Sequence, residues 1–190
     1  MCAATAQGAR RLQFGCGAFA AEGWINTNLT PGPGVDIRCD IRTGLPLPDD
    51  SMQYIASMHA IVELPYLDVV PALRELRRVL EPDGVLRLGL PDLDRAIDAY
   101  RSGDRTYFSI PDDEMASIDG KFVVQMTWYG TNLMMFTFDL ARELLGRAGF
   151  RDVRRAAYGK TTSRFPEIVA LDNRPKESFF VEAVKCPSRR

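Results

Sequence analysis

The chain has 190 residues, a length that suits one domain with a buried core. Its 24 Lys and Arg residues nearly balance 25 Asp and Glu residues, so the formal net charge of -1 gives no basic field to recruit nucleic acid or an anionic membrane. Four scattered cysteines and one histidine do not form the spacing of a metal site, and we expect no metal. The N-terminus lacks the order of a signal peptide and no apolar run is long enough to cross a bilayer, so we expect a cytoplasmic protein.

Short apolar runs bounded by turn residues predict four strands in the first third of the chain, at 11–15, 23–29, 34–41 and 52–60. A helix is predicted next, over 67–80, because its apolar residues recur with a period of about 3.6. Pro71 is expected in the first turn of this helix, where its missing N–H costs least, and "EPDG" supplies the stop.

The second half of the chain adds a strand at 84–91 and a helix at 139–148, with Asp139 as the N-cap and Gly149 as the C-terminal glycine. Two further strands are predicted at 151–159 and 177–185. This order of elements is typical of an α/β protein with a doubly wound, mostly parallel sheet that ends in an antiparallel strand pair. The whole chain, 1–190, is interpreted as a single domain with an irregular insertion at about 95–136.

Two closely spaced glycines, Gly15 and Gly17, follow the first predicted strand. Ligands of open α/β sheets collect at the carboxyl ends of the strands, and a glycine lets the backbone approach a ligand without a Cβ in the way. A tight turn without a ligand needs the same residues. The third glycine of a dinucleotide fingerprint is replaced by Ala20, which disfavours a nicotinamide-dependent reductase.

The motifs "LQFGCG", "GWINTNL", "DIRCDIRTGLPLPDDS", "MHAIVELPY", "ALRELRRVLEPDGVLRLGLPDLD", "LLGRAGFRDV" and "LDNRPKESFFVEA" occur in this order along nearly the whole chain. In order and spacing they resemble a bacterial branch of class I S-adenosylmethionine (SAM)-dependent methyltransferases, the type 11-like proteins with a Rossmann-like fold. That branch is associated with sugar, polysaccharide and secondary-metabolite pathways. Its first helix is curtailed, so that the glycines lead directly to Gly-Trp.

The resemblance implies a cofactor site for SAM. Gly15, Cys16 and Gly17 would pass beside the methionine part of the cofactor. Asn28 stands where the family normally places a carboxylate for the ribose hydroxyls, and an amide binds them more weakly. The remaining cofactor positions are at the ends of the third and fourth strands: Asp40 toward the adenine amino group, Ile41 beside the ring, and Ser57 and Met58 at the rim. A solvated turn is the alternative interpretation of Asp40.

Methyl transfer needs an aligned nucleophile and a site that excludes water, and a base helps when the nucleophile is a hydroxyl. His59 is the first candidate for that base, with Glu63 and Asp92 as weaker ones, and Tyr129 could orient a substrate hydroxyl. A packed structural role is the alternative for the single histidine. The family's H-V-L-E-H reads H-A-I-V-E here, so the usual Glu-His pair is replaced.

The insertion is expected to supply an apolar pocket for a small-molecule acceptor, although core packing explains the same residues. The candidates are Tyr107, Phe108, Phe122, Trp128, Tyr129, Met134 and Met135. O-methylation of a small hydroxylated acceptor is the favoured function. N-methylation, and a non-catalytic SAM-binding or partner subunit, are the alternatives. Apolar surface on the insertion would also support a homodimer.

Overall fold

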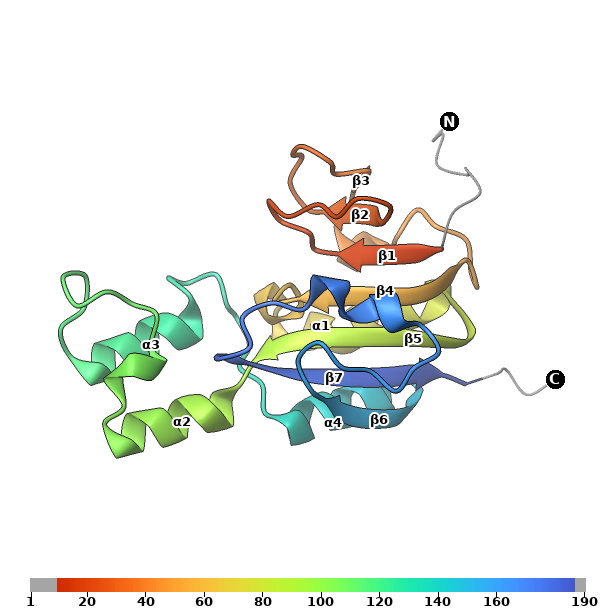
Figure 1. Cartoon of the computed structure of the whole chain (residues 1–190). Coiled ribbons are helices and arrows are strands. Elements are labelled where there is room, and N and C mark those ends of the chain that lie inside the picture. Colours follow the sequence, from red (N-terminus) through yellow and green to blue (C-terminus); the bar gives the residue numbers. More distant parts are fainter. Residues whose placement is uncertain (1–9, 187–190) are drawn as a thin grey trace.

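A seven-stranded sheet forms the centre of the computed structural model, which describes residues 10–186 (Figure 1). The strand order is β3-β2-β1-β4-β5-β7-β6. Strands β1 to β5 are parallel, and β7 runs antiparallel to both β5 and β6. The strands are β1 (Arg11–Phe14), β2 (Ile25–Asn28), β3 (Ile37–Arg38), β4 (Met52–Met58), β5 (Leu80–Pro91), β6 (Phe150–Ala156) and β7 (Ser178–Lys185). The mostly parallel sheet with an antiparallel C-terminal pair is therefore confirmed.

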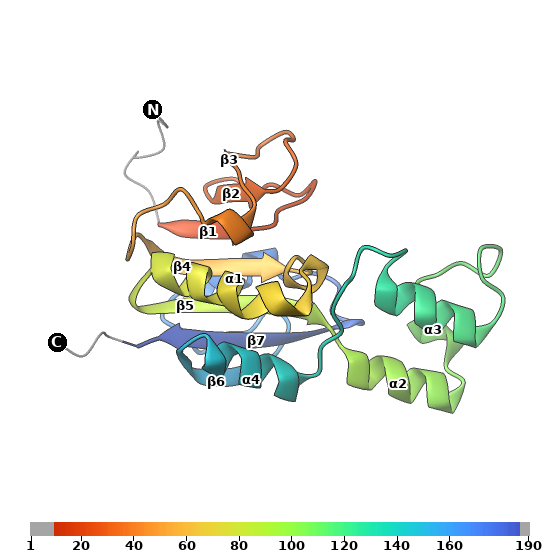
Figure 2. The ribbon, with the colours of Figure 1, turned by 180° about the vertical axis from the view of Figure 1, so that it is seen from behind.

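One face of the sheet packs against two helices, which lie side by side in the view from behind (Figure 2). The α-helices are α1 (Tyr66–Val79), α2 (Leu93–Ser102), α3 (Ile118–Thr127) and α4 (Phe138–Arg147). Short 3-10 turns are η1 (Ile41–Thr43), η2 (Ile61–Glu63), η3 (Arg105–Tyr107) and η4 (Pro166–Leu171). Helices α1 and α4 cover one face, and η4 closes the other, where Ile168 packs against Trp24 and Tyr54.

The two predicted helices that flank the sheet form within one residue of the expected positions. In α1, Leu73 and Leu76 point into the core, and the helix ends at Val79. Pro71 lies inside α1, beyond the first turn in which it was expected. In α4 the N-cap is Thr137 rather than Asp139, because the Thr137 hydroxyl accepts from the Leu140 N–H. The helix thus begins one residue earlier than predicted.

The segment at about 95–136 is more regular than the sequence predicts. It contains most of α2 and all of α3, which lie beyond the carboxyl end of β5 (Figure 1). Asp92 caps α2 by accepting from the Arg95 N–H, and Ser117 caps α3 by accepting from the Gly120 N–H. Helix α3 was missed because it buries two polar side chains, Lys121 and Gln125, which interrupt its apolar stripe.

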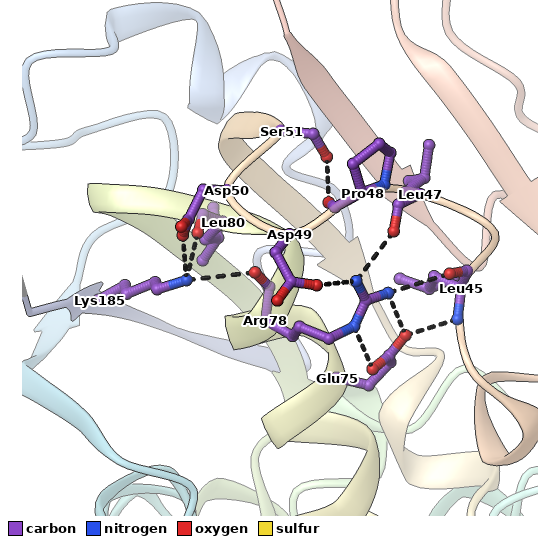
Figure 3. Close-up of polar contacts among 10 residues, drawn as sticks. All are labelled: Leu45, Leu47, Pro48, Asp49, Asp50, Ser51, Glu75, Arg78, Leu80 and Lys185. Atoms are coloured by element: carbon purple, nitrogen blue, oxygen red, sulfur yellow. Dashed lines mark hydrogen bonds and ion pairs between the residues drawn. The ribbon is translucent and has the colours of Figure 1, made fainter. Parts of the chain in front are cut away.

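The loop before β4 is fastened to the end of α1 by two basic residues (Figure 3). The Arg78 guanidinium donates to Glu75 on its own helix, to Asp49, and to the carbonyls of Leu45 and Leu47. Lys185 on β7 donates to Asp50 and to the carbonyls of Arg78 and Leu80. These contacts fix the connection from η1 to the start of β4.

The helices in the described part of the chain are short. Among residues 10–186, none of them has the length and apolar character that crossing a membrane requires.

Candidate functional site

A cavity of about 780 Å³ opens at the carboxyl ends of β1, β2 and β4. This is the edge at which open α/β sheets bind ligands. Most of the predicted site residues line it: Gly15, Cys16, Gly17, Asn28, Asp40, Ile41, Met58, His59 and Glu63. Ser57 and Tyr129 are not among the lining residues.

The turn after β1 explains why two glycines are needed there. Gly15 and Gly17 adopt φ values of 70° and 55°, which side chains with a Cβ rarely adopt. A Cβ on Gly15 would lie 2.2 Å from the Cβ of Ala60, whereas a Cβ on Gly17 would meet no atom within 4 Å. Gly15 therefore allows the β1 turn to pack against the start of η2, and Gly17 is required by backbone conformation alone.

The connection from β1 to β2 contains no helix between residues 15 and 24, as the resemblance implied. Two buried amides hold it instead. The Gln13 side chain donates to the Phe19 carbonyl and accepts from the Ala21 N–H. The Asn26 side chain also accepts from Ala21 N–H, and it donates to the carbonyls of Ala21 and Trp24. Side-chain amides thus replace the hydrogen bonds that a helix would have made internally.

Polar acceptors at the ends of β2 and β3 face the same cavity. The Asn28 amide donates to the Thr30 carbonyl and hydroxyl, which leaves its Oδ1 without a partner among the described residues. Asp40 caps η1 and holds the Arg42 guanidinium, with 2.6 Å between Oδ2 and Nη2. These hydrogen bonds from Arg42 lower the pKa of Asp40 below its usual value, so the carboxylate is ionised.

This end of the cavity fits an adenosine-type cofactor. Asn28 Oδ1 could accept a hydrogen bond from a hydroxyl group. Each oxygen of the Asp40 carboxylate already accepts two hydrogen bonds from Arg42, so a bond from an amino group would replace one of these. Ile41 and Cys16 add buried apolar surface, and burial raises the pKa of the Cys16 thiol. No helix N-terminus follows β1 in residues 15–24, so a pyrophosphate lacks its usual binding site there.

His59 lies at the end of β4 with both ring nitrogens in contact. Its Nε2 is 2.7 Å from the Ser178 hydroxyl, and its Nδ1 is 3.4 Å from Arg174 Nη1. A guanidinium only donates, so Nδ1 is the acceptor and Nε2 carries the proton. Burial and the charge of Arg174 lower the pKa of His59 to about 3. The imidazole is therefore neutral at physiological pH.

The other predicted catalytic and rim residues lie in different surroundings. Glu63, at the end of η2, is exposed and borders the cavity, and desolvation raises its pKa. Tyr129 is exposed, and its hydroxyl donates to Glu114 at 2.9 Å. Ser57 is buried within β4, where its hydroxyl has no partner among the described residues. Asp92, the weaker candidate base, is buried as the cap of α2.

Most of the aromatic and methionine residues predicted to line the acceptor pocket pack in a hydrophobic core instead. Tyr107, Phe108 and Phe122 pack with Ala96 and Met126 into a core of their own between α2 and α3. Met134 packs against the main core, and Met135 is partly exposed without lining the cavity. Of the predicted wall, Trp128 alone lines the cavity. The aromatic residues were predicted from composition, and composition does not distinguish a pocket from a small core.

The cavity wall opposite the cofactor end comes from residues that the sequence analysis did not identify. Gln125 and Asn132 reach it from α3 and the loop after it, and Arg174 and Glu177 reach it from the segment before β7. The sequence carries one weak signal, the turn-rich "LDNRPK", and of these four residues it contains only Arg174.

The segment that carries Arg174 is tied to the sheet by a buried ion cluster. Arg87 on β5 has no exposed surface and binds Asp172 at 2.5 Å and Glu182 at 2.6 Å. It also donates to the carbonyls of Ala157 and Lys160. Arg87 thereby holds the start of the connection after β6 and the residue that follows η4, and this residue, Asp172, borders the cavity two residues before Arg174.

No metal-binding cluster of three or more His, Cys, Asp or Glu side chains is found within residues 10–186. The chemistry that the cavity offers is hydrogen bonding, charge and apolar surface. It can hold an organic cofactor at the glycine turn and a second small molecule at the wall formed by α3 and the segment before β7.

Known proteins resemble this chain in sequence over its first half and in fold over nearly all of it. Residues 12–88 match the family model described as a methyltransferase domain. A SAM-dependent methyltransferase from Archaeoglobus fulgidus is similar, with 13% identity and a TM-score of 0.61 over 94% of this chain and 86% of that chain. One from Mesorhizobium loti has 20% identity and a TM-score of 0.55 over 93% and 91%. A search of curated proteins gave no match.

A SAM-dependent methyltransferase from Thermotoga maritima is also similar, with 17% identity and a TM-score of 0.57 over 95% of this chain and 84% of that chain. At these identities the solved structures show the fold. The sequence match adds the domain type, over the strands and turns that form the cofactor end of the cavity. Residues 12–88 therefore match a methyltransferase domain in sequence, and the fold of the chain is the one found in SAM-dependent methyltransferases.

Proposed function

We propose that the protein methylates a hydroxyl group of a small acceptor, a sugar or secondary metabolite, with SAM as the methyl donor. The observation that carries this proposal is one cavity lined by two groups of residues. The cofactor end is the group from the glycine turn and the ends of β2 and β3. The acceptor end is the group around Arg174, which contacts both His59 and Trp128. Holding both reactants in one space aligns them and excludes water, which is most of what a methyl transfer needs.

The cofactor end is assigned to SAM, which supplies a methyl group already activated on a sulfonium. Gly15, Cys16 and Gly17 are proposed to contact its methionine part through the backbone. Asn28 would accept from the ribose hydroxyls and Asp40 from the adenine amino group. Asn28 is uncharged, so its hydrogen bond is weaker than that of a carboxylate.

Glu63 is the better candidate for the general base. It borders the cavity, has no side-chain partner among the described residues, and has a raised pKa, which makes its carboxylate more basic. His59 remains a prediction as a base. Its pKa of about 3 and its two contacts favour a positioning role, because a weakly basic imidazole takes up a proton poorly. Glu63→Gln should lower kcat by about a hundredfold or more.

Calorimetric titration with SAM, with S-adenosylhomocysteine (SAH) and with NADH as a control tests the cofactor. Selective binding of the two sulfur ligands supports the proposal, and binding of neither contradicts it. Turnover is then measured as SAH formation over a panel of sugars and small alcohols. Binding without turnover on any acceptor would favour the alternative, a SAM-binding partner subunit without activity of its own.

N-methylation is the second candidate, and one observation favours it. Two carboxyl groups, those of Glu63 and Glu177, border the acceptor end, and carboxylates attract a cationic amine. Matched acceptors that differ only in a hydroxyl or an amino group distinguish the two functions. Faster SAH formation with the amine would replace O-methylation by N-methylation.

A homodimer also remains a proposal. Exposed apolar side chains gather on and after α3: Val123, Tyr129, Leu133 and Met135. Light scattering on the purified chain measures its mass, and a mass of one chain at all concentrations would contradict the dimer.

A further inference from the structure

One arginine at the acceptor end has a longer contact with its carboxylate partner than Arg42 and Arg87 have with theirs. Arg174 Nη1 lies 3.6 Å from Glu177 Oε1, beyond hydrogen-bond distance, and 3.4 Å from His59 Nδ1. In contrast, Arg42 and Arg87 bind carboxylates at 2.6 Å and 2.5 Å. The Arg174 side chain is 38% exposed and lines the cavity. Its remaining N–H groups have no partner among the described residues.

The Arg174 guanidinium is nevertheless held in a defined position. It lies over the Trp128 ring, with 5.0 Å between its Cζ and the ring centroid. Stacking on an aromatic face leaves the edge of the guanidinium fork free to donate. Arg174, Trp128 and His59 also share a rare backbone conformation, with φ values of 50°, 42° and 57°. Such strain is typical of functional sites, where the surrounding structure maintains it.

A second unpaired donor belongs to the same wall. The Gln125 side chain is 3% exposed, and its Oε1 accepts from the Ser109 N–H at 2.6 Å. This hydrogen bond fixes the orientation of the amide. The other end, Nε2, is buried and has no partner among the described residues, although Gln125 lines the cavity. A buried donor without a partner is costly, so the site gains when a ligand oxygen satisfies it.

We propose that the acceptor carries a carboxylate, that Arg174 binds this group while Trp128 orients the guanidinium, and that Gln125 donates to the same ligand. The proposal rests on the proposed function and names the class of its acceptor. A guanidinium fork matches the two oxygens of a carboxylate. Glu63 and Glu177 border the same cavity and repel an anion, so the carboxylate must contact the Arg174 guanidinium directly for the attraction to exceed this repulsion.

Paired probes that differ only in charge test the proposal. The probes are 4-hydroxybenzoate and 3-hydroxybutyrate, each compared with its amide, titrated calorimetrically into the full chain with and without SAH. At least one carboxylate should bind about tenfold tighter than its amide. Arg174→Gln should abolish that preference and Arg174→Lys should keep part of it, because lysine retains the charge without the fork.

A matched control exists on the same segment. Arg164 also stacks on an aromatic ring, that of Phe165, but does not line the cavity. Arg164→Gln should leave the preference unchanged. Gln125→Glu keeps an acceptor for the Ser109 N–H and replaces the donor by a carboxylate oxygen, so it should weaken carboxylate binding about tenfold. The ratio of carboxylate to amide affinity reports recognition, whereas a purely structural role would lower both affinities together.

Equal affinities for each pair, or no binding of either carboxylate, would overturn the proposal. A carboxylate preference that survives Arg174→Gln would also overturn it. If that variant weakens SAH and leaves the probes unchanged, the carboxylate bound by Arg174 is that of the cofactor, and the assignment to the acceptor fails. Failure of wild-type protein to bind SAH contradicts the proposed function, while the titrations without SAH still decide the role of Arg174.

Discussion

The two ends of the cavity are held by different chemistry. At the cofactor end, the turn from β1 to β2 is fixed by neutral amides, those of Gln13 and Asn26, which bond to backbone groups nearby in the sequence. At the acceptor end, the segment before β7 is fixed by the buried charge of Arg87, whose partners lie 70 or more residues away.

The difference teaches how each end is specified. The glycine turn of the cofactor end is local: a strand, two glycines and two amides within 16 residues form it, from Leu12 to Thr27. The acceptor end is assembled from η2, α3 and the segment before β7, so it depends on long-range contacts. The cofactor end suits a cofactor that is the same for every acceptor. The residues of the acceptor end can be replaced to fit a different acceptor without a change in the sheet.

The largest expected effect comes from removing the buried charge. Arg87→Met leaves Asp172 and Glu182 without their counter-ion and should lower the free energy of unfolding by about 3–5 kcal/mol. Asn26→Leu is the matched change at the other end, and it should cost about 1–3 kcal/mol because it leaves neutral backbone groups unpaired. Urea titration measures both. Equal losses would show that the two ends are held with equal strength.

The second effect concerns the glycine turn. Gly15→Ala should cost about 1–2 kcal/mol for the left-handed conformation and about 1–3 kcal/mol more for the overlap with Ala60. Gly17→Ala carries only the conformational cost, since nothing lies within 4 Å of its Cβ position. Urea titration of the two variants gives the comparison. If Gly17→Ala is the more damaging, the turn is not packed against η2 in this way.

A smaller effect is expected for the carboxylate at the end of β3. Asp40→Ala should weaken SAM binding about tenfold with little change in melting temperature, because Asp40 is partly exposed and its proposed contact is with the adenine amino group. Asp68→Ala is the control, since Asp68 also faces Arg42, at 3.9 Å, but does not line the cavity. Unchanged affinity in Asp40→Ala, measured by calorimetry, would remove Asp40 from the cofactor site.

Several residues that line this end of the cavity could be named from the sequence. Gly15 and Gly17 directly follow a strand, and the family resemblance implied Asn28 and Asp40. All four line the cavity because the carboxyl ends of parallel strands meet at one edge of the sheet. Ser57 and Met58 were both expected at the rim, and of the two only Met58 lines the cavity. Side chains alternate along a strand, and the β4 residue that reaches the cavity is Met58.

The acceptor end could not be predicted in the same way. Gln125 is a buried polar residue in a helix whose pattern lacks a clear apolar face, and Arg174 lies in a turn without a motif. Their meeting at one wall depends on how α3 packs beyond β5 and on the ion cluster around Arg87. Tyr107 and Phe108 were expected at this wall for their residue type, but a small core between α2 and α3 uses them.

The smallest expected effect concerns the charge of the His59 ring, which should not change between pH 8 and pH 5. The pKa of His59 is lowered to about 3 by burial and by Arg174, so its ring should stay neutral in the folded protein from pH 8 to pH 5. It is the only histidine in the chain, so its ring proton signals in an NMR titration need no assignment by mutation. The unfolded chain takes up this proton near pH 6.5. Stability from His59 is therefore complete above pH 6.5 and is lost as pH falls toward 3, and His59→Gln should remove this dependence.

Arg174→Gln sharpens the same measurement. It removes the second cause of the shift and keeps the first, so the pKa of His59 should rise and remain below 6.5. Arg164→Gln, which alters a charge away from the cavity, should leave the ring signals unchanged. A midpoint near 6.5 in the wild-type protein would mean that the ring is solvated and free to accept a proton. His59 would then again be the first candidate for the general base. Its ring would titrate near physiological pH, whereas burial and Arg174 would otherwise keep it neutral.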